Sequence, residues 1–266
     1  MIIRQEHMVA LEQAAARGFQ SRMLERMRSH FPKHAQCLSE PQQLAVIQLS
    51  AKRAQDHGLT AERSVALYLD LMCVLGSEFD TDPQIPWAAA ILADRRFPTQ
   101  ADRIDLLHSK GWAFANKVSA DLHNGLKNGS ATGLVAAISE IRTKGVEELT
   151  PDGARRVTAE IFGRIRQLFP IKSEAIGDEC VWLLIREAVR SATSYGIRNA
   201  RGIWLFTSLM SVVGTGFDRD PQLPWASETL TDRAIGDGTE RVNQLYVKAL
   251  TALKQWWGPA ARAAAS

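Results

Sequence analysis

The chain has 266 residues, of which 45% are hydrophobic and 23% are charged. This composition argues against general disorder, and the length suffices for one large domain or two of the usual size. The net charge of +3 is spread almost evenly, because both halves carry nearly equal numbers of basic and acidic residues. A nucleic-acid binder normally shows a clustered basic face, so we expect no nucleic-acid partner.

The cysteine content and the N-terminal sequence indicate in which cellular compartment the protein is expected. The three cysteines lack C-x-x-C spacing and leave an odd thiol, which fits a reducing compartment better than a disulfide framework. The opening stretch, MIIRQEHMVALEQ, carries early charges and no apolar run of signal-peptide length. Longer apolar stretches, such as the one interrupted by Asp70, are too short to span a bilayer. We therefore expect a cytoplasmic protein with no membrane partner, while secretion without a cleaved signal stays open.

Two helices are expected at the start of the chain. Apolar residues at three- and four-residue steps form a stripe that begins at Met8 and predicts a helix stopping at Pro32. Ser39 and Gln42 then match a capping box with a proline in the first turn. The helix that they open is expected to stop at Gly58, since glycine favours the left-handed conformation that ends helices.

Three further helices are expected in the first half. Thr60 is predicted to cap a helix that ends at Gly76. A short helix is predicted to start near Pro86, and a longer one near Thr99. The stretch HNGLKNGSATG, residues 123–133, is the strongest cluster of helix breakers in the chain and indicates a linker.

The second half repeats this order of elements. A helical stretch, Leu134–Arg142, is expected within the linker region. Thr150 and Pro151 are predicted to open a helix that reaches Phe169. Further helices are expected around Val181–Tyr195, Ile203–Val213, Pro224–Asp232 and Thr239–Trp257. No run of alternating β-branched residues bounded by turns indicates a strand, so the sequence predicts an all-α fold.

The chain contains an internal repeat with an offset of 138 residues. FDTDPQIPW, residues 79–87, recurs as FDRDPQLPW, residues 217–225, with seven of nine positions identical. Matches at the same offset continue over a span of about eighty positions without insertion or deletion. We predict a tandem duplication of a roughly five-helix unit, which gives two pseudo-symmetric halves. The predicted divisions are repeat 1 at 1–122, a linker with one helix at 123–149 and repeat 2 at 150–266.

The repeated segment, residues 79–87 and 217–225, which we call the corner, contains two aspartates in each copy. Asp80 and Asp82 match a D-x-D pattern, which suits a metal or phosphosugar site because hard cations need several converging oxygen ligands. The only further local acid, Glu78, is replaced by Gly216 in the second copy. Alternatively, the carboxylates accept from free backbone N–H groups, the prolines fix φ, and the aromatic rings pack on the core. We favour this structural interpretation for Phe79, Asp80, Asp82, Pro83 and Trp87, and for Phe217, Asp218, Asp220, Pro221 and Trp225.

Other candidates for chemistry have little support in the sequence. His30 and His34 are four residues apart, but Pro32 lies between them and no further ligand completes a metal set. Cys73 lies on an apolar helix face with Ser211 as its counterpart, which is typical of a buried small residue. No phosphate-binding glycine loop or nucleophile elbow is present in the sequence. We therefore expect no catalytic residue, no metal ion and no cofactor.

Tryptophan is concentrated in the second half, where it occurs five times against twice in the first. Tryptophan is enriched in the energetic hot spots of protein interfaces, although most tryptophans at helical spacing belong to cores. Trp256 and Trp257 are adjacent, and two adjacent residues of a helix cannot both face one core. They are therefore the predicted partner contacts, and the cleft between the halves is the expected place for a binding site.

Four segments of the first half carry a resemblance to a known group of proteins. They are the opening MIIRQEHMVALEQ, the helix end HFPKH, the turn from Ala54 to Thr60, and LMCVLGSEFDTDPQIPWA from Leu71 to Ala88. Over about the first hundred residues the chain resembles small bacterial proteins encoded beside toxins and accessory genes of type VI secretion clusters. The tandem second copy departs from the single-copy members. The resemblance implies a protein-binding role beside a toxin.

Four functions follow as hypotheses. The first is a non-catalytic, cytoplasmic immunity protein that binds and neutralises a cognate secreted toxin encoded by a neighbouring gene. The second is an adaptor or chaperone that delivers a toxin to a type VI secretion system. The third is a metal-dependent enzyme that uses the repeated Asp-x-Asp corner. The fourth is a nucleic-acid binder, which a steep salt dependence of binding would support.

Overall fold

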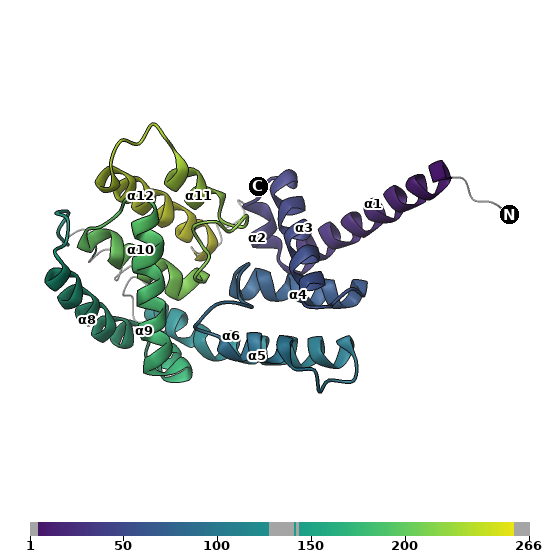
Figure 1. Cartoon of the computed structure of the whole chain (residues 1–266), viewed down its shortest axis with the longest axis horizontal. Helices are drawn as coiled ribbons and strands as arrows, with labels where there is room; N and C mark the ends of the chain where they lie inside the picture. The colour runs from purple at the N-terminus through teal and green to yellow at the C-terminus, as the bar shows by residue number, and fades with distance from the viewer. Residues whose placement is uncertain (1–4, 128–140, 142–143, 258–266) are drawn as a thin grey trace, which may run out of the picture.

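The computed structural model describes residues 5–127, 141 and 144–257, and within these ranges it contains eleven helices and no strand (Figure 1). The all-α prediction is therefore confirmed. The helices of the first half are α1 Gln5–His30, α2 Pro32–Gln36, α3 Glu40–Asp56, α4 Glu62–Leu75, α5 Pro86–Ala93 and α6 Gln100–Lys127. Those of the second half are α8 Pro151–Leu168, α9 Pro170–Ser194, α10 Ala200–Val213, α11 Pro224–Thr231 and α12 Gly238–Trp257.

Local sequence signals account for several of these helix ends. The capping box before α3 is confirmed, because the backbone N–H of Ser39 donates to Oε1 of Gln42 at 2.9 Å. The stop after α3 is also confirmed, since Gly58 has φ of 70°. At the start of α8, the side chain of Thr150 accepts from the backbone N–H of Gly153 at 3.1 Å.

The predicted cap of α4 is wrong. Ala61, and not Thr60, is the residue at which the backbone turns from extended to helical. The backbone N–H groups of Thr60 and Ala61 both donate to Oε1 of Gln100, at 2.8 and 3.0 Å. The side chain of Gln100, at the start of α6, therefore binds the two N–H groups that precede the helix, and Ala61 provides no side-chain cap.

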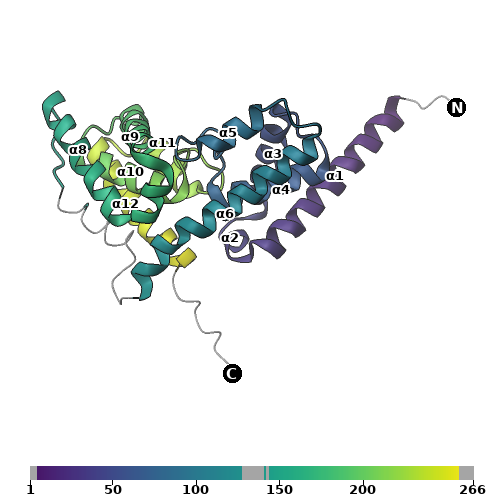
Figure 2. The ribbon, with the colours of Figure 1, turned by 90° about the horizontal axis from the view of Figure 1, so that it is seen from below.

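Helix α6 extends beyond the boundary expected at residue 122. It continues to Lys127, so residues 123–127 are helical although they begin the predicted breaker cluster. The rest of that cluster, and most of the predicted helix Leu134–Arg142, lie outside the described residues. Figures 1 and 2 show α6 running from the first half towards the second, and α6 contacts α9.

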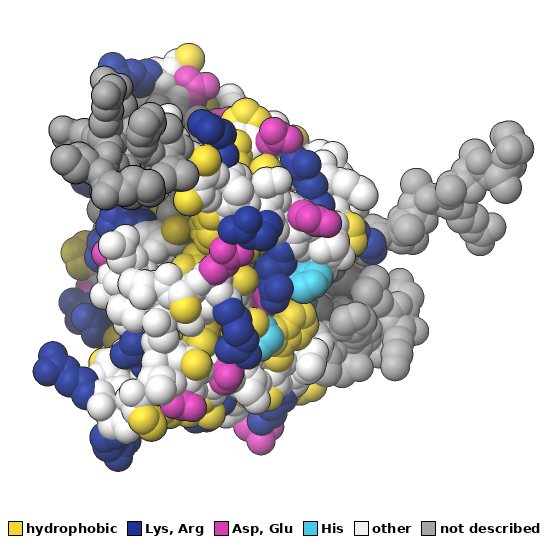
Figure 3. Space-filling view, turned by 90° about the vertical axis from the view of Figure 1, so that its right-hand side faces the viewer, with side chains coloured by type: hydrophobic (Ala, Val, Ile, Leu, Met, Phe, Trp, Pro, Cys, Tyr) yellow, Lys and Arg dark blue, Asp and Glu magenta, His cyan; other side chains and the backbone are white. Residues whose placement is uncertain are grey.

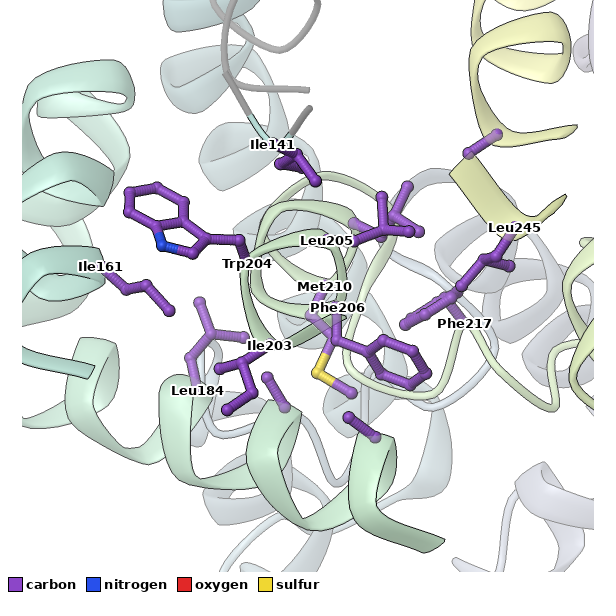
Figure 4. Packing of buried hydrophobic residues seen from close by; sticks show 14 of the residues in the cluster. Ile141, Ile161, Leu184, Ile203, Trp204, Leu205, Phe206, Met210, Phe217 and Leu245 are labelled. Atoms are coloured by element: carbon purple, nitrogen blue, oxygen red, sulfur yellow. The ribbon is translucent and has the colours of Figure 1, made fainter. Parts of the chain in front are cut away.

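Each half has its own hydrophobic core. The first is formed by residues of α1 to α6 and includes Tyr68 and Phe79. The second includes Trp204, Phe206 and Phe217, which Figure 4 shows packed with Met210 of α10 and with leucine and isoleucine side chains from neighbouring helices. Burial of large apolar and aromatic side chains is the main source of stability in such cores.

Corresponding elements of the two halves have matching geometry. The helices α4 and α10 have 14 residues each and start 138 positions apart. Gly76 and Gly214, which follow them, have φ of 97° and ψ of 155° and 157°. One difference concerns Gly177, which has φ of 81° and bends α9, whereas its counterpart Ser39 separates α2 from α3.

Candidate functional site

The two repeated corners meet at the seam between the halves. Gly76 and Gly214 end α4 and α10 and lie against each other's helix. A Cβ atom on Gly76 would lie 2.7 Å from the carbonyl oxygen of Val213, and one on Gly214 would lie 3.0 Å from that of Leu75. Glycine is required here because the backbones touch and because φ is positive.

The second aspartate of each corner binds the backbone of the other half. Asp220 accepts from the backbone N–H of Ser77 at 2.9 Å and from its hydroxyl at 2.6 Å. In the reciprocal contact, Asp82 accepts from the backbone N–H of Thr215 at 3.0 Å. Because these N–H groups lie just after α4 and α10, each corner completes the helix end of the opposite half.

Two glutamines strengthen the same exchange. The side-chain amide of Gln84 donates to the carbonyl oxygen of Met210 at 2.9 Å, and that of Gln222 donates to the carbonyl oxygen of Met72 at 2.9 Å. These carbonyls belong to the last turns of α10 and α4, where they also accept from the backbone N–H groups of Gly214 and Gly76, at 3.2 and 3.0 Å. The structural interpretation predicts that each corner stabilises its own half. These contacts show that each corner also binds the other half.

One contact at the seam lacks symmetry. The guanidinium of Arg219 binds the carboxylate of Glu78, with Nε 2.6 Å from Oε1. A Cβ atom on Gly216, the counterpart of Glu78, would lie 2.6 Å from the Glu78 carboxyl carbon. The absence of a side chain at Gly216 therefore leaves room for Glu78, which a larger residue at position 216 would displace.

The first aspartate of each corner stays within its own half. Asp80 is held by Arg53, by Nε2 of His57 at 2.8 Å and by the hydroxyl of Tyr68 at 2.7 Å. Burial alone would raise the pKa of Asp80, but hydrogen bonds from these three side chains hold that pKa at about 2. The carboxylate is therefore ionised under ordinary conditions.

The corresponding Asp218 accepts from the hydroxyls of Ser191 at 2.6 Å and Tyr195 at 3.2 Å. Asp80 and Asp82 thus face different partners and do not converge on one point, as a D-x-D metal site requires. Across the described ranges, no group of three or more His, Cys, Asp or Glu side chains is arranged to hold a metal ion.

The remaining corner residues lie at the edges of the two cores. Phe79 and Phe217 are fully buried, and Trp87 and Trp225 are partly buried against the same clusters. Pro83 and Pro221 lie in the turns before α5 and α11. Trp256 and Trp257, the predicted partner contacts, belong to the end of α12, but their side chains lie outside the described residues.

A cavity of about 360 Å³ opens at the seam, where the sequence predicted a cleft. Both halves contribute to its walls, and Cys73, Asp220 and Lys172 are among the residues that line it. Burial, together with the nearby carboxylates of Asp70 and Asp220, raises the pKa of the Cys73 thiol. The thiol is therefore protonated at neutral pH, which is unlike a catalytic nucleophile.

Burial also raises the pKa of both aspartates that cross the seam. For Asp82, the charge of Lys172 and the backbone N–H groups of Gln84 and Thr215 oppose this effect. For Asp220, the hydrogen bonds from Ser77 and Gln222 oppose it. Both carboxylates are at most 4% exposed, so their hydrogen bonds have no competition from water.

Two stacked aromatic side chains, one from α8 and one from α9, lie at the edge of the second core. Phe162 and Trp182 stack with ring centroids 4.4 Å apart and an interplanar angle of 7°. The guanidinium of Arg166 lies over the Phe162 ring, with its carbon 5.7 Å from the ring centroid. Trp182 and its neighbour Leu183 are 39% and 37% exposed. We call Phe162, Arg166 and Trp182 the aromatic face.

The sequence contains a signal for this face. At the offset of 138, Phe162 and Trp182 correspond to Leu24 and Leu44, so the second half has two aromatic rings where the first has two leucines. Elsewhere the surface is mixed in charge: on the side where α1 lies, Figure 3 shows basic and acidic side chains interspersed.

Comparison of the chain with protein-family models, curated proteins and solved structures gives no match. Among the helices in the described part of the chain, none has both the length and the apolar character needed to cross a membrane.

Proposed function

We propose that the chain is a non-catalytic protein-binding protein, and specifically a cytoplasmic immunity protein that binds and neutralises a cognate secreted toxin. The aromatic face is the observation that carries this proposal. Tryptophan and arginine dominate the hot spots of protein interfaces, and a stacked Phe162–Trp182 pair presents a rigid apolar surface at little entropic cost. The partner is expected to be encoded by a neighbouring gene.

The contacts of the repeated corner support a non-catalytic role. Asp80, Asp82, Asp218 and Asp220 all accept hydrogen bonds from groups of the fold itself. A catalytic carboxylate needs access to a substrate, and the four residues are at most 4% exposed. We further propose that the chain arose by tandem duplication, and that the second copy became the binding half when it acquired its aromatic face.

Growth protection tests the immunity role. The neighbour-encoded toxin is expressed in a heterologous bacterium together with the full chain, and colony formation is counted. Wild-type chain should restore growth, and Trp182→Ala should lose most of this protection. Trp112→Ala is the matched control, since Trp112 is 36% exposed but lies on α6 of the first half. Equal protection by both variants would show that the aromatic face does not bind the toxin.

Growth protection and toxin export together separate immunity from delivery. An adaptor that loads a toxin onto a type VI secretion system would bind it without restoring growth. Deletion of the gene would then abolish export of the toxin from the native host. Binding without protection, together with lost export, would replace the immunity proposal with the adaptor function.

A further inference from the structure

A short segment of the second half, residues 144–149, lies across α8 and the start of α10, and we call it the strap. Near its end, the backbone N–H of Leu149 donates to the carbonyl oxygen of Arg198 at 3.0 Å. Near its start, the carbonyl oxygen of Gly145 accepts from the backbone N–H of Arg201 at 3.1 Å. The strap therefore binds a donor in the first turn of α10, where N–H groups have no acceptor within their own helix.

Side chains tie the strap to both helices. The ammonium of Lys144 binds the carboxylate of Glu160 on α8 and lies 4.5 Å from the ring centroid of Trp204 on α10. Three residues before the strap, Ile141 is fully buried in the same core as Trp204 (Figure 4). The contacts of the strap are thus an ion pair, a backbone hydrogen bond and apolar packing.

The first half has a groove at the place that the strap covers in the second half. This groove lies between α1 and α4 and has a volume of about 550 Å³. Three residues that line it are the counterparts, at the offset of 138, of those that the strap contacts: Arg22, Arg63 and Ala66. The backbone N–H of Arg63, unlike that of Arg201, meets no acceptor among the described residues.

The matching stretch of the first half carries the same apolar residues. Residues 6–11 are the counterpart of the strap, and both stretches end on a leucine, Leu11 and Leu149. Three residues before each stretch stands an isoleucine, Ile3 and Ile141. In the second half these side chains belong to the core or pack against it. The first half therefore has apolar residues of the same kind with which to cover its groove.

The ion pair of the strap has a counterpart with its charges exchanged. Lys144 corresponds to Glu6, and its partner Glu160 corresponds to Arg22. A pair in which both signs are reversed keeps its attraction. The stretch that matches the strap is therefore complementary in charge to the groove of its own half.

In the structure this stretch belongs to the outer end of α1. Figures 1 and 2 show that end running away from the rest of the chain, and residues 13–17, which follow the stretch, are exposed. Five consecutive residues cover every side of a helix, so this part of α1 gains little from packing. A short helical segment without packing is only marginally stable in water, so its unwinding costs little.

We propose that residues 6–11 leave α1 and lie in the groove of the first half as a second strap. Glu6 then pairs with Arg22, and a backbone carbonyl of the segment accepts from the N–H of Arg63. Arg22 binds Glu62 in the structure, but both side chains are exposed, so the exchange of partner costs little. The second strap belongs to the first half and is independent of the partner that binds the aromatic face.

A disulfide between Ala10→Cys and Ala61→Cys tests the proposal in the full chain, with the native cysteines replaced by serine. These positions are the counterparts of Glu148 and Asn199, which form an antiparallel bridge, and such pairs lie within disulfide range. In a continuous α1, position 10 lies about 18 Å along the axis from Arg22, which reaches only the start of α4, so no bond can form. We expect the bond to form within one chain on oxidation, identified by mass spectrometry of the peptides.

The matched control is Glu148→Cys with Asn199→Cys, whose bond should form under the same conditions because the strap is in place. Formation of the control bond without the bond between positions 10 and 61 overturns the proposal. A bond that joins two chains, seen as a dimer on a non-reducing gel, also overturns it, because the segment then lies in the groove of another copy.

The exchanged charges provide a second test. In the chain with cysteines at positions 10 and 61, Glu6→Lys should slow bond formation about threefold. Addition of Arg22→Glu should restore the rate, because the pair then has the signs found in the second half. Glu12→Lys is the matched control, since it makes the same change of charge at a residue whose counterpart, Thr150, caps its own helix. Equal rates for Glu6→Lys and Glu12→Lys, or no recovery with Arg22→Glu, overturn the pairing of the second strap with α1.

Discussion

Replacement of Asp220 by alanine should destabilise the protein far more than loss of an ordinary turn residue. The change removes the acceptor for four donors: the Ser77 N–H at 2.9 Å, the Ser77 hydroxyl at 2.6 Å, the Gln222 N–H at 2.8 Å and the Gln222 side-chain amide at 3.4 Å. Asp220 is 3% exposed, so water has poor access to the abandoned N–H groups. A buried donor left without a partner costs roughly 1–3 kcal/mol.

The loss of an acceptor for the backbone N–H groups of Ser77 and Gln222 therefore determines most of the change in the free energy of unfolding. The cost of burying the carboxylate, which raises the pKa of Asp220, offsets part of it. We expect the free energy of unfolding to fall by about 3 kcal/mol, measured by urea denaturation followed by circular dichroism. The variant Asp232→Ala is the matched control, because Asp232 also accepts an N–H two residues ahead, from Ala234 at 2.8 Å, but in an exposed turn.

The control should lose about 1 kcal/mol or less, since water replaces the missing acceptor. A double-mutant cycle between Asp220→Ala and Ser77→Ala should give a coupling energy of about 1 kcal/mol for the hydroxyl contact. If Asp220→Ala costs no more than Asp232→Ala, the exchange of contacts across the seam does not stabilise the protein, and the reasoning fails.

Two other variants probe the corners. Asp80, with a folded pKa of about 2 against an ordinary 3.8, stabilises the fold above about pH 4, and this contribution disappears as the pH falls towards 2. Asp80→Asn should therefore cost about 2 kcal/mol near neutral pH and much less at about pH 2, by urea titration at both; a cost independent of pH would contradict the assigned cause. Gly76→Ala should cost about 3 kcal/mol, from a φ of 97° and a clash with the Val213 carbonyl, whereas Gly196→Ala, with φ of 75° and open space, should cost about 1 kcal/mol. Equal unfolding temperatures of these two glycine variants would show that the close approach at the seam does not add to the cost of an alanine.

Helices and their ends could be predicted because their signals are local. The capping box at Ser39, the stop at Gly58 and the cap at Thr150 depend on residues within one or two turns. The prediction failed at Thr60 because the helix begins one residue later, and Gln100, forty residues away, binds the N–H group of Thr60 itself. It also missed the continuation of α6 to Lys127, since tertiary packing readily overrides breaker residues within a long helix.

The hydrogen bonds across the seam could not be predicted from the sequence, for a different reason. The repeat of the Asp-x-Asp corner shows that both copies need acceptors, but a carboxylate does not specify which N–H group it will bind. Asp82 and Thr215 are 133 residues apart, and only the fold brings them together. One signal was available: Glu78 and Gly216 break the repeat, and a large residue facing an absent side chain is typical of two copies that contact each other.

The most direct test of the proposed function is capture of the protein partner by the aromatic face. Tagged full-length chain, Trp182→Ala and Trp112→Ala are each recovered from the native host, and co-purifying proteins are quantified by mass spectrometry. We predict one neighbour-encoded toxin at near-stoichiometric amounts with the wild-type chain and with Trp112→Ala, and its loss with Trp182→Ala. Recovery of no such protein, or equal recovery with all three chains, would contradict the account.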